Sequence, residues 1–147
     1  MIYPATQAIS DFFEEKANQG KRVQFEVSDD ERSSEVDVGI LGHGRVRFIS
    51  RDNDMDVSVR LFNYGDFRVN ESNREGMLRA CNRSNNEYRF VKFTVDTDDT
   101  INVEYDFPVE TDPESIGVVC WEIYKRMEDI LDKCYHFFRD ADGDREF

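Results

Sequence analysis

The C-terminal third of this chain carries an apolar stripe with the period of an α-helix. Its members recur three and four residues apart over about seven turns: Ile116, Val119, Cys120, Ile123, Met127, Ile130, Leu131, Cys134, Phe137 and Phe138. Asp112 can cap such a helix, and Pro113 suits its first turn. A long helix with one apolar face needs a comparably large apolar surface to lie on. The preceding residues must build that surface.

Five earlier segments alternate apolar and polar residues, which is the period of a half-buried β-strand. They are residues 36–40, 45–48, 57–62, 89–95 and 101–107. Residues 22–27 also fit a strand that pairs with the sheet or lies at its edge. The connections are short acidic or glycine turns at residues 43–44, 52–54 and 98–99, so we expect hairpins of antiparallel neighbours.

Two further helices complete the expected fold. Ile9, Phe12 and Phe13 follow helical spacing over residues 6–18, and Gly20 ends that helix. Ser72 and Glu75 have the spacing of a capping box at the start of a short helix. The chain is therefore predicted to be α+β, an antiparallel sheet with helices packed on one face, in the order α-β-β-β-α-β-β-α. We expect one domain over residues 1–139 and a flexible acidic tail over residues 140–147.

The segment from residue 80 to 109 joins the middle helix to the last hairpin. Asn82 and Asn85 lie at the helix end, residues 89–92 open a strand, and Asp106 closes the return strand before Pro108. This pattern resembles the YbjN family, whose domain shares the fold of type III secretion chaperones. The resemblance implies a homodimer and a regulatory, non-enzymatic role. Since asparagine also favours helix ends and left-handed turns, residues 81–86 equally fit a simple turn.

The chain has 147 residues and a net charge of −13, which disfavours nucleic acid and anionic membranes as partners. The charge is uneven: residues 96–147 hold 16 acidic and 5 basic residues, whereas residues 1–95 hold 16 and 14. An acidic inhibitor of a basic partner, such as an immunity protein or antitoxin, is therefore an alternative to a chaperone-like or regulatory binding module. The start of the chain lacks a signal-peptide pattern and no stretch is long and apolar enough to span a bilayer, so we expect a cytoplasmic protein.

Residues that could carry catalysis or bind a metal are scarce. The three cysteines, Cys81, Cys120 and Cys134, are expected to be buried thiols. His43 in a Gly-His-Gly turn and His136 on the last helix are expected to be solvated, and neither has an identifiable nucleophile. The acidic runs at residues 52–56 and 140–146 fail the calcium-loop pattern. We therefore predict a protein that is not an enzyme and has no cofactor or metal.

The strand alternation also gives the sheet a polar outer face, on which cations, carboxylates and aromatic rings are mixed. One interpretation is a solvated surface of cross-strand pairs, each worth about 0.2–1 kcal/mol. The other is a surface that binds another protein, since aromatic and arginine side chains are typical of interfaces. The predicted partner-binding residues are Arg45, Arg47, Arg60, Phe62, Phe90 and Lys92, with Asn82, Asn85 and Asp106 as family signature positions.

Overall fold

The computed structural model describes residues 1–51, 56–108 and 113–143. Three α-helices and six strands account for most of them, with a short 3₁₀ turn, η1, at Tyr64–Asp66. The helices are α1 (Pro4–Asn18), α2 (Arg74–Glu87) and α3 (Pro113–Ala141). The strands are β1 (Phe25–Asp29), β2 (Ser33–Ile40), β3 (Gly44–Arg51), β4 (Asp56–Leu61), β5 (Lys92–Val95) and β6 (Ile101–Pro108).

All six strands form one antiparallel sheet in the order β1-β2-β3-β4-β6-β5. The predicted α+β class is confirmed. The segment predicted at residues 22–27 becomes β1, shifted by two to three residues, and β1 forms one edge of the sheet. The strand predicted at residues 89–95 is shorter, because residues 89–91 form a turn and β5 begins only at Lys92.

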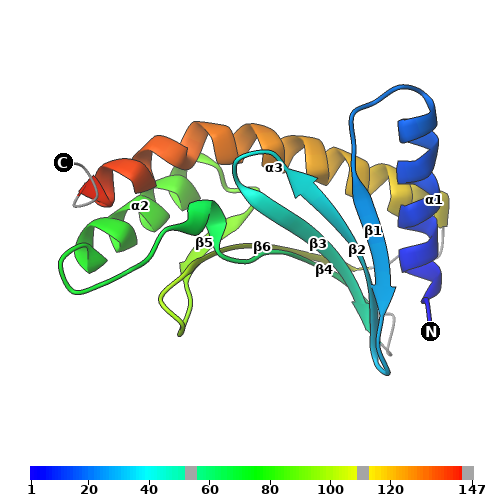
Figure 1. Cartoon of the computed structure of the whole chain (residues 1–147), viewed down its shortest axis with the longest axis horizontal. Coiled ribbons are helices and arrows are strands. Elements are labelled where there is room, and N and C mark those ends of the chain that lie inside the picture. The colour runs from blue at the N-terminus through cyan, green and yellow to red at the C-terminus, as the bar shows by residue number, and fades with distance from the viewer. Residues whose placement is uncertain (52–55, 109–112, 144–147) are drawn as a thin grey trace.

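The helices cover one face of the sheet, as Figure 1 shows. α3 spans the length of the molecule, α1 packs against its N-terminal half, and α2 packs against its C-terminal half. The close approach of α1 to α3 is made at Gly117, where a β-carbon would come within 2.6 Å of Phe12 Cβ. The long apolar stripe therefore does lie on an apolar surface, which the sheet and the two shorter helices provide together.

Two groups of aromatic side chains fill the core at opposite ends of α3. At one end Phe13 lies between Phe48 of β3 and Trp121 of α3, with ring centroids 5.8 and 5.2 Å away. At the other end Tyr64 packs edge-on against Phe93 and Phe138. Such edge-to-face pairs add to the free energy of burial by about 0.5–1.5 kcal/mol each.

Two sequence expectations are corrected here. The asparagine-rich residues 81–86 are not a turn, because α2 continues through them to Glu87. Residues 140–142 are not a flexible tail: α3 includes Asp140 and Ala141, and Asp142 is buried against Asn73, whose side chain donates to its Oδ1 at 3.2 Å. The calcium-like residues 52–55 and the expected cap Asp112 lie outside the described residues.

Candidate functional site

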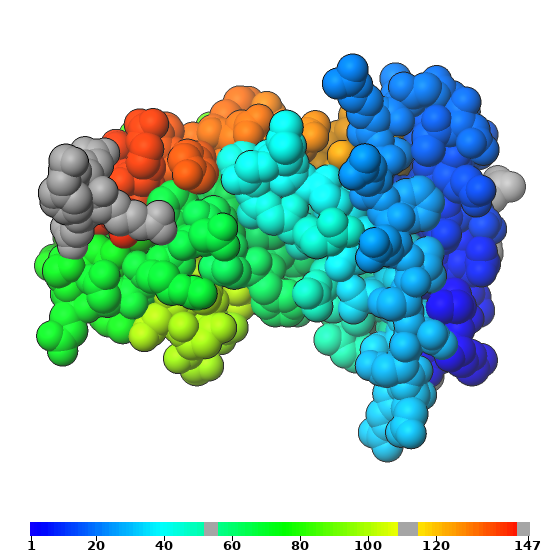
Figure 2. All heavy atoms as spheres, viewed as in Figure 1, coloured from blue at the N-terminus to red at the C-terminus, as the bar shows by residue number. Residues whose placement is uncertain are grey.

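The candidate site is the sheet face opposite the helices, called here the outer face. It presents alternate residues of each strand, and one row crosses the whole sheet through directly paired positions. In order, the row is Glu26, Asp37, Arg47, Arg60, Glu104 and Lys92. The sheet is bent, and the space-filling view is hollowed at its lower margin, on the side away from α3 (Figure 2).

Two arginines occupy the centre of this row on neighbouring strands. Arg47 and Arg60 are paired across β3 and β4, an arrangement that is unfavourable for like charges. Each arginine has carboxylates on its other side. Arg47 Nε lies 3.8 Å from Asp37 and 3.9 Å from Glu35, and Arg60 Nη1 lies 2.7 Å from Asp106. The outer face is therefore a basic centre between two acidic strands.

The carboxylates of the outer face differ in their electrostatic environment. Two hydrogen bonds from the Arg60 guanidinium, at 2.7 and 3.3 Å, hold the pKa of Asp106 below its usual value. Glu35 shows the opposite effect, since partial burial raises its pKa more than the distant charge of Arg47 lowers it. Arg60 thus favours the charged form of Asp106, whereas burial disfavours the charged form of Glu35.

Five of the six predicted partner-binding residues lie on the outer face, namely Arg45, Arg47, Arg60, Phe62 and Lys92. The sixth, Phe90, does not. Arg45 forms an ion pair with Asp37, and the Arg47 guanidinium lies 5.4 Å from the Phe62 ring, which is 43% exposed. Phe90 instead stacks on Tyr105, with centroids 4.9 Å apart, and lies under Arg126 of α3. The prediction that Phe90 shares the arginine face is therefore wrong, because the turn before β5 breaks the alternation.

The two asparagines of the signature segment have different environments within α2. Asn85 donates from Nδ2 to the Phe93 carbonyl at 3.1 Å and accepts from the Phe93 N–H at 2.7 Å. It therefore occupies the hydrogen-bonding groups that a neighbouring strand would otherwise use. Asn82 is exposed and lines a shallow groove between α2 and α3 with Arg83 and Phe137.

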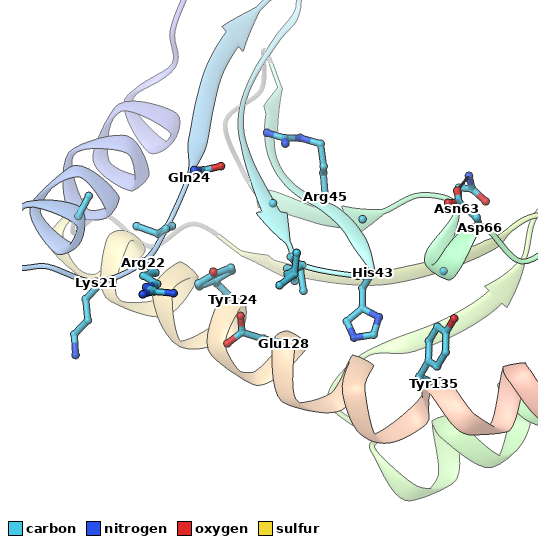
Figure 3. Close-up of a pocket in the computed structure, with 18 residues that line it drawn as sticks. Lys21, Arg22, Gln24, His43, Arg45, Asn63, Asp66, Tyr124, Glu128 and Tyr135 are labelled. Carbon is cyan, nitrogen blue, oxygen red and sulfur yellow. Dashed lines mark hydrogen bonds between the residues drawn. The ribbon is translucent and has the colours of Figure 1, made fainter.

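A second concave region lies between the β2–β3 hairpin and α3 (Figure 3). This open cleft of about 1140 Å³ is bounded by residues 21–24, the hairpin, η1 and α3. His43 points from the hairpin toward α3, where its Nε2 lies 2.5 Å from Asp132 Oδ1. It is only 8% exposed, so the prediction of a solvated turn histidine is wrong. Its partner lies 89 residues away, a contact that no local sequence signal shows.

The chemistry of the cleft is limited by its lining. A histidine held by a carboxylate is half of a nucleophile-activating arrangement, but no serine, threonine or cysteine is among the described residues that line the cleft.

The three cysteines are unpaired and buried, as predicted, and burial raises the pKa of Cys81 to about 12. Residues 1–51, 56–108 and 113–143 contain no cluster of His, Cys, Asp and Glu suited to a metal ion. None of the described helices is long and apolar enough to cross a membrane.

Comparison with known proteins gives one match. The model of the YbjN family, described as "Putative bacterial sensory transduction regulator", matches residues 15–136. This range covers most of the chain and includes all six described strands and most of α3. No curated protein and no solved structure matches.

Proposed function

Because this chain belongs to the YbjN family, we propose that it regulates another protein by binding it on the outer face of its sheet. The family description names regulation and no reaction, which agrees with a binding role. We assign the binding surface to five residues of the outer face: Arg45, Arg47, Arg60, Phe62 and Lys92. A cytoplasmic location is part of the same proposal.

The observation that carries this proposal is the arrangement around Arg47 and Phe62. The exposed ring of Phe62 lies beside the guanidinium of Arg47 on a bent face. This guanidinium has the carboxylates of Glu35 and Asp37 3.9 and 3.8 Å away. Arginine and aromatic residues are the usual anchors of protein interfaces, whereas the surrounding charges exclude wrong partners. A partner carboxylate that binds Arg60 in place of Asp106 leaves the Asp106 carboxylate to be solvated, which its 57% exposure permits.

The test is capture of the tagged protein's partners from the lysate of its own host, with mass spectrometry of proteins recovered near equal stoichiometry. The double variant Arg60→Ala with Phe62→Ala should lose a partner that the wild type recovers. The ion-pair partners of Arg60 are the exposed carboxylate of Asp106 and the half-buried one of Glu104, so we expect circular dichroism and melting to stay near wild type.

A matched control uses an exposed pair elsewhere on the surface. Leu78 and Arg79 of α2 are 50% and 71% exposed, so Leu78→Ala with Arg79→Ala also removes one arginine and one large apolar side chain, away from the sheet. This control should capture the partner as the wild type does. Equal capture by all three proteins would disprove the assignment of the outer face.

A second candidate is the acidic inhibitor, for which the excess of acidic residues after residue 95 is the supporting observation. Between residues 115 and 141, α3 carries five acidic and four basic residues, so the described part of that helix is nearly balanced. Recovery of a toxin or nuclease in the same capture experiment would favour the inhibitor. The homodimer implied by the family resemblance is tested separately by light scattering of the purified protein.

A further inference from the structure

The two edges of the sheet are finished in different ways. At the β5 edge, α2 packs alongside the strand and Asn85 occupies both main-chain groups of Phe93. At the other edge, β1 pairs with β2 alone among the strands that the structure describes. Natural proteins usually cover or charge a strand edge, because its unpaired N–H and C=O groups are a template for another strand.

The register shows which main-chain groups of β1 are available. Gly39 N donates to the carbonyl of Gln24 at 3.2 Å, so Gln24 and every second residue after it point their main-chain groups toward β2. Phe25, Val27 and Asp29 therefore point theirs away from the sheet. Within the described residues, none of these main-chain groups has a hydrogen-bond partner.

The side chains around this edge define what an added strand would meet. On the helix side, Val27 is 39% exposed and Phe25 is half-buried, so an apolar side chain next to them would bury further apolar surface. On the outer face, Glu26 is exposed and is paired with Asp37 of β2. A neighbouring strand with cations on that face would lie directly beside Glu26, which forms no ion pair within the described residues, whereas Asp37 is already paired with Arg45.

We propose that the β1 edge, Phe25 to Asp29, binds an extended segment of a partner protein in which apolar residues alternate with lysine or arginine. The segment adds a seventh strand, with its apolar residues over Phe25 and Val27 and its cations beside Glu26. This inference rests on the proposed function, since it states how the partner of the outer face is held.

The probe is the fluorescently labelled peptide acetyl-Val-Lys-Val-Lys-Val-Lys-Val-amide, and binding to the whole chain is followed by anisotropy. Two matched peptides serve as controls: one has the same composition with its lysines adjacent, and the other has glutamate in place of lysine. The alternating lysine peptide should bind at least about tenfold more tightly than either, because only in it do the valines all face Phe25 and Val27 while the lysines face Glu26. It should also slow hydrogen exchange at the amides of Phe25, Val27 and Asp29.

Three variants locate the binding. Val27→Pro removes an outward N–H at an edge position that tolerates proline and should weaken binding about tenfold. Glu26→Lys leaves the main chain intact and should reverse the preference between the lysine and glutamate peptides. The control variant is Val118→Lys, which places a lysine at an exposed position of α3 far from β1 in sequence. This variant should bind the peptide as the wild type does. Thermal unfolding establishes that each variant is folded.

The outcomes separate this inference from the proposed function. Equal binding of the three peptides, or binding unchanged by Val27→Pro and Glu26→Lys, would overturn the edge assignment. If Arg60→Ala with Phe62→Ala loses the captured partner while Val27→Pro retains it, the edge inference fails and the outer-face proposal stands. If the wild type is a dimer and Val27→Pro dissociates it, a second copy of this chain occupies the β1 edge. That result would disprove the proposal that a cationic segment of another protein binds there.

Discussion

Replacing Asn85 by alanine should open the second edge of the sheet and destabilise the protein. The side-chain amide of Asn85 makes two hydrogen bonds with the main chain of Phe93, at 2.7 and 3.1 Å. Phe93 is 1% exposed, so water cannot readily replace the amide at this position. The substitution therefore leaves a donor and an acceptor without partners beside a buried strand.

The expected magnitude follows from the two bonds. Each contributes a net of about 0.5–1.5 kcal/mol, so their loss costs about 1–3 kcal/mol. Alanine returns up to about 0.7 kcal/mol because it favours a helix more than asparagine does. Asn82→Ala is the matched control, since Asn82 lies in the same helix, is exposed, and gains the same helix propensity without losing these bonds.

Urea unfolding of the two variants measures the difference directly, because the common gain in propensity cancels. Asn85→Ala should be less stable than Asn82→Ala by about 1–3 kcal/mol, and each 1 kcal/mol should lower the melting temperature by about 2–4 °C in a chain of this size. Hydrogen exchange at the Phe93 amide should accelerate in Asn85→Ala alone. Stabilities of the two variants equal within about 0.5 kcal/mol would refute the edge-closing role of Asn85.

Two further predictions concern the contact of α1 with α3 and the outer face. Gly117→Val should cost about 1–3 kcal/mol in urea unfolding, because its β-carbon would come within 2.6 Å of Phe12 Cβ, whereas Val118→Ala at the exposed next position should change little. The folded-state pKa of Asp106 lies below its usual 3.8 because of Arg60, so the carboxylate stabilises the fold above that pH and the stabilisation disappears as pH falls through the folded-state pKa. Asp106→Asn should accordingly be less stable than wild type by under about 1 kcal/mol at neutral pH, and a gap that failed to close in acid would contradict this.

The sequence predicts best those elements in which the apolar spacing recurs over many residues. The stripe over residues 116–138 locates α3 correctly, because about seven turns of apolar spacing outweigh any local ambiguity. The outer face is likewise predicted where strands are regular, so Arg45, Arg47, Arg60 and Phe62 lie where alternation places them.

The errors occur where a distant contact outweighs a local preference. Phe90 is displaced to the helix side because the strand begins three residues later than its alternation indicates, so the ring stacks on Tyr105. The asparagine-rich segment stays helical because Asn85 bonds to β5 and Ser84 is buried, although asparagine alone favours a turn. The burial of His43 depends on Asp132, which periodicity in the hairpin cannot reveal.

The placement of α3 has a consequence for the synthesis of this protein. The helix is 29 residues and about 43 Å long, and it follows all six described strands. While a ribosome is still adding α3, the apolar face of the sheet has no cover along its centre. At about 5–20 residues per second, the nascent chain keeps this face accessible to other proteins for seconds. The nascent chain should therefore need protection by other factors at the stage when β6 is complete and α3 is not.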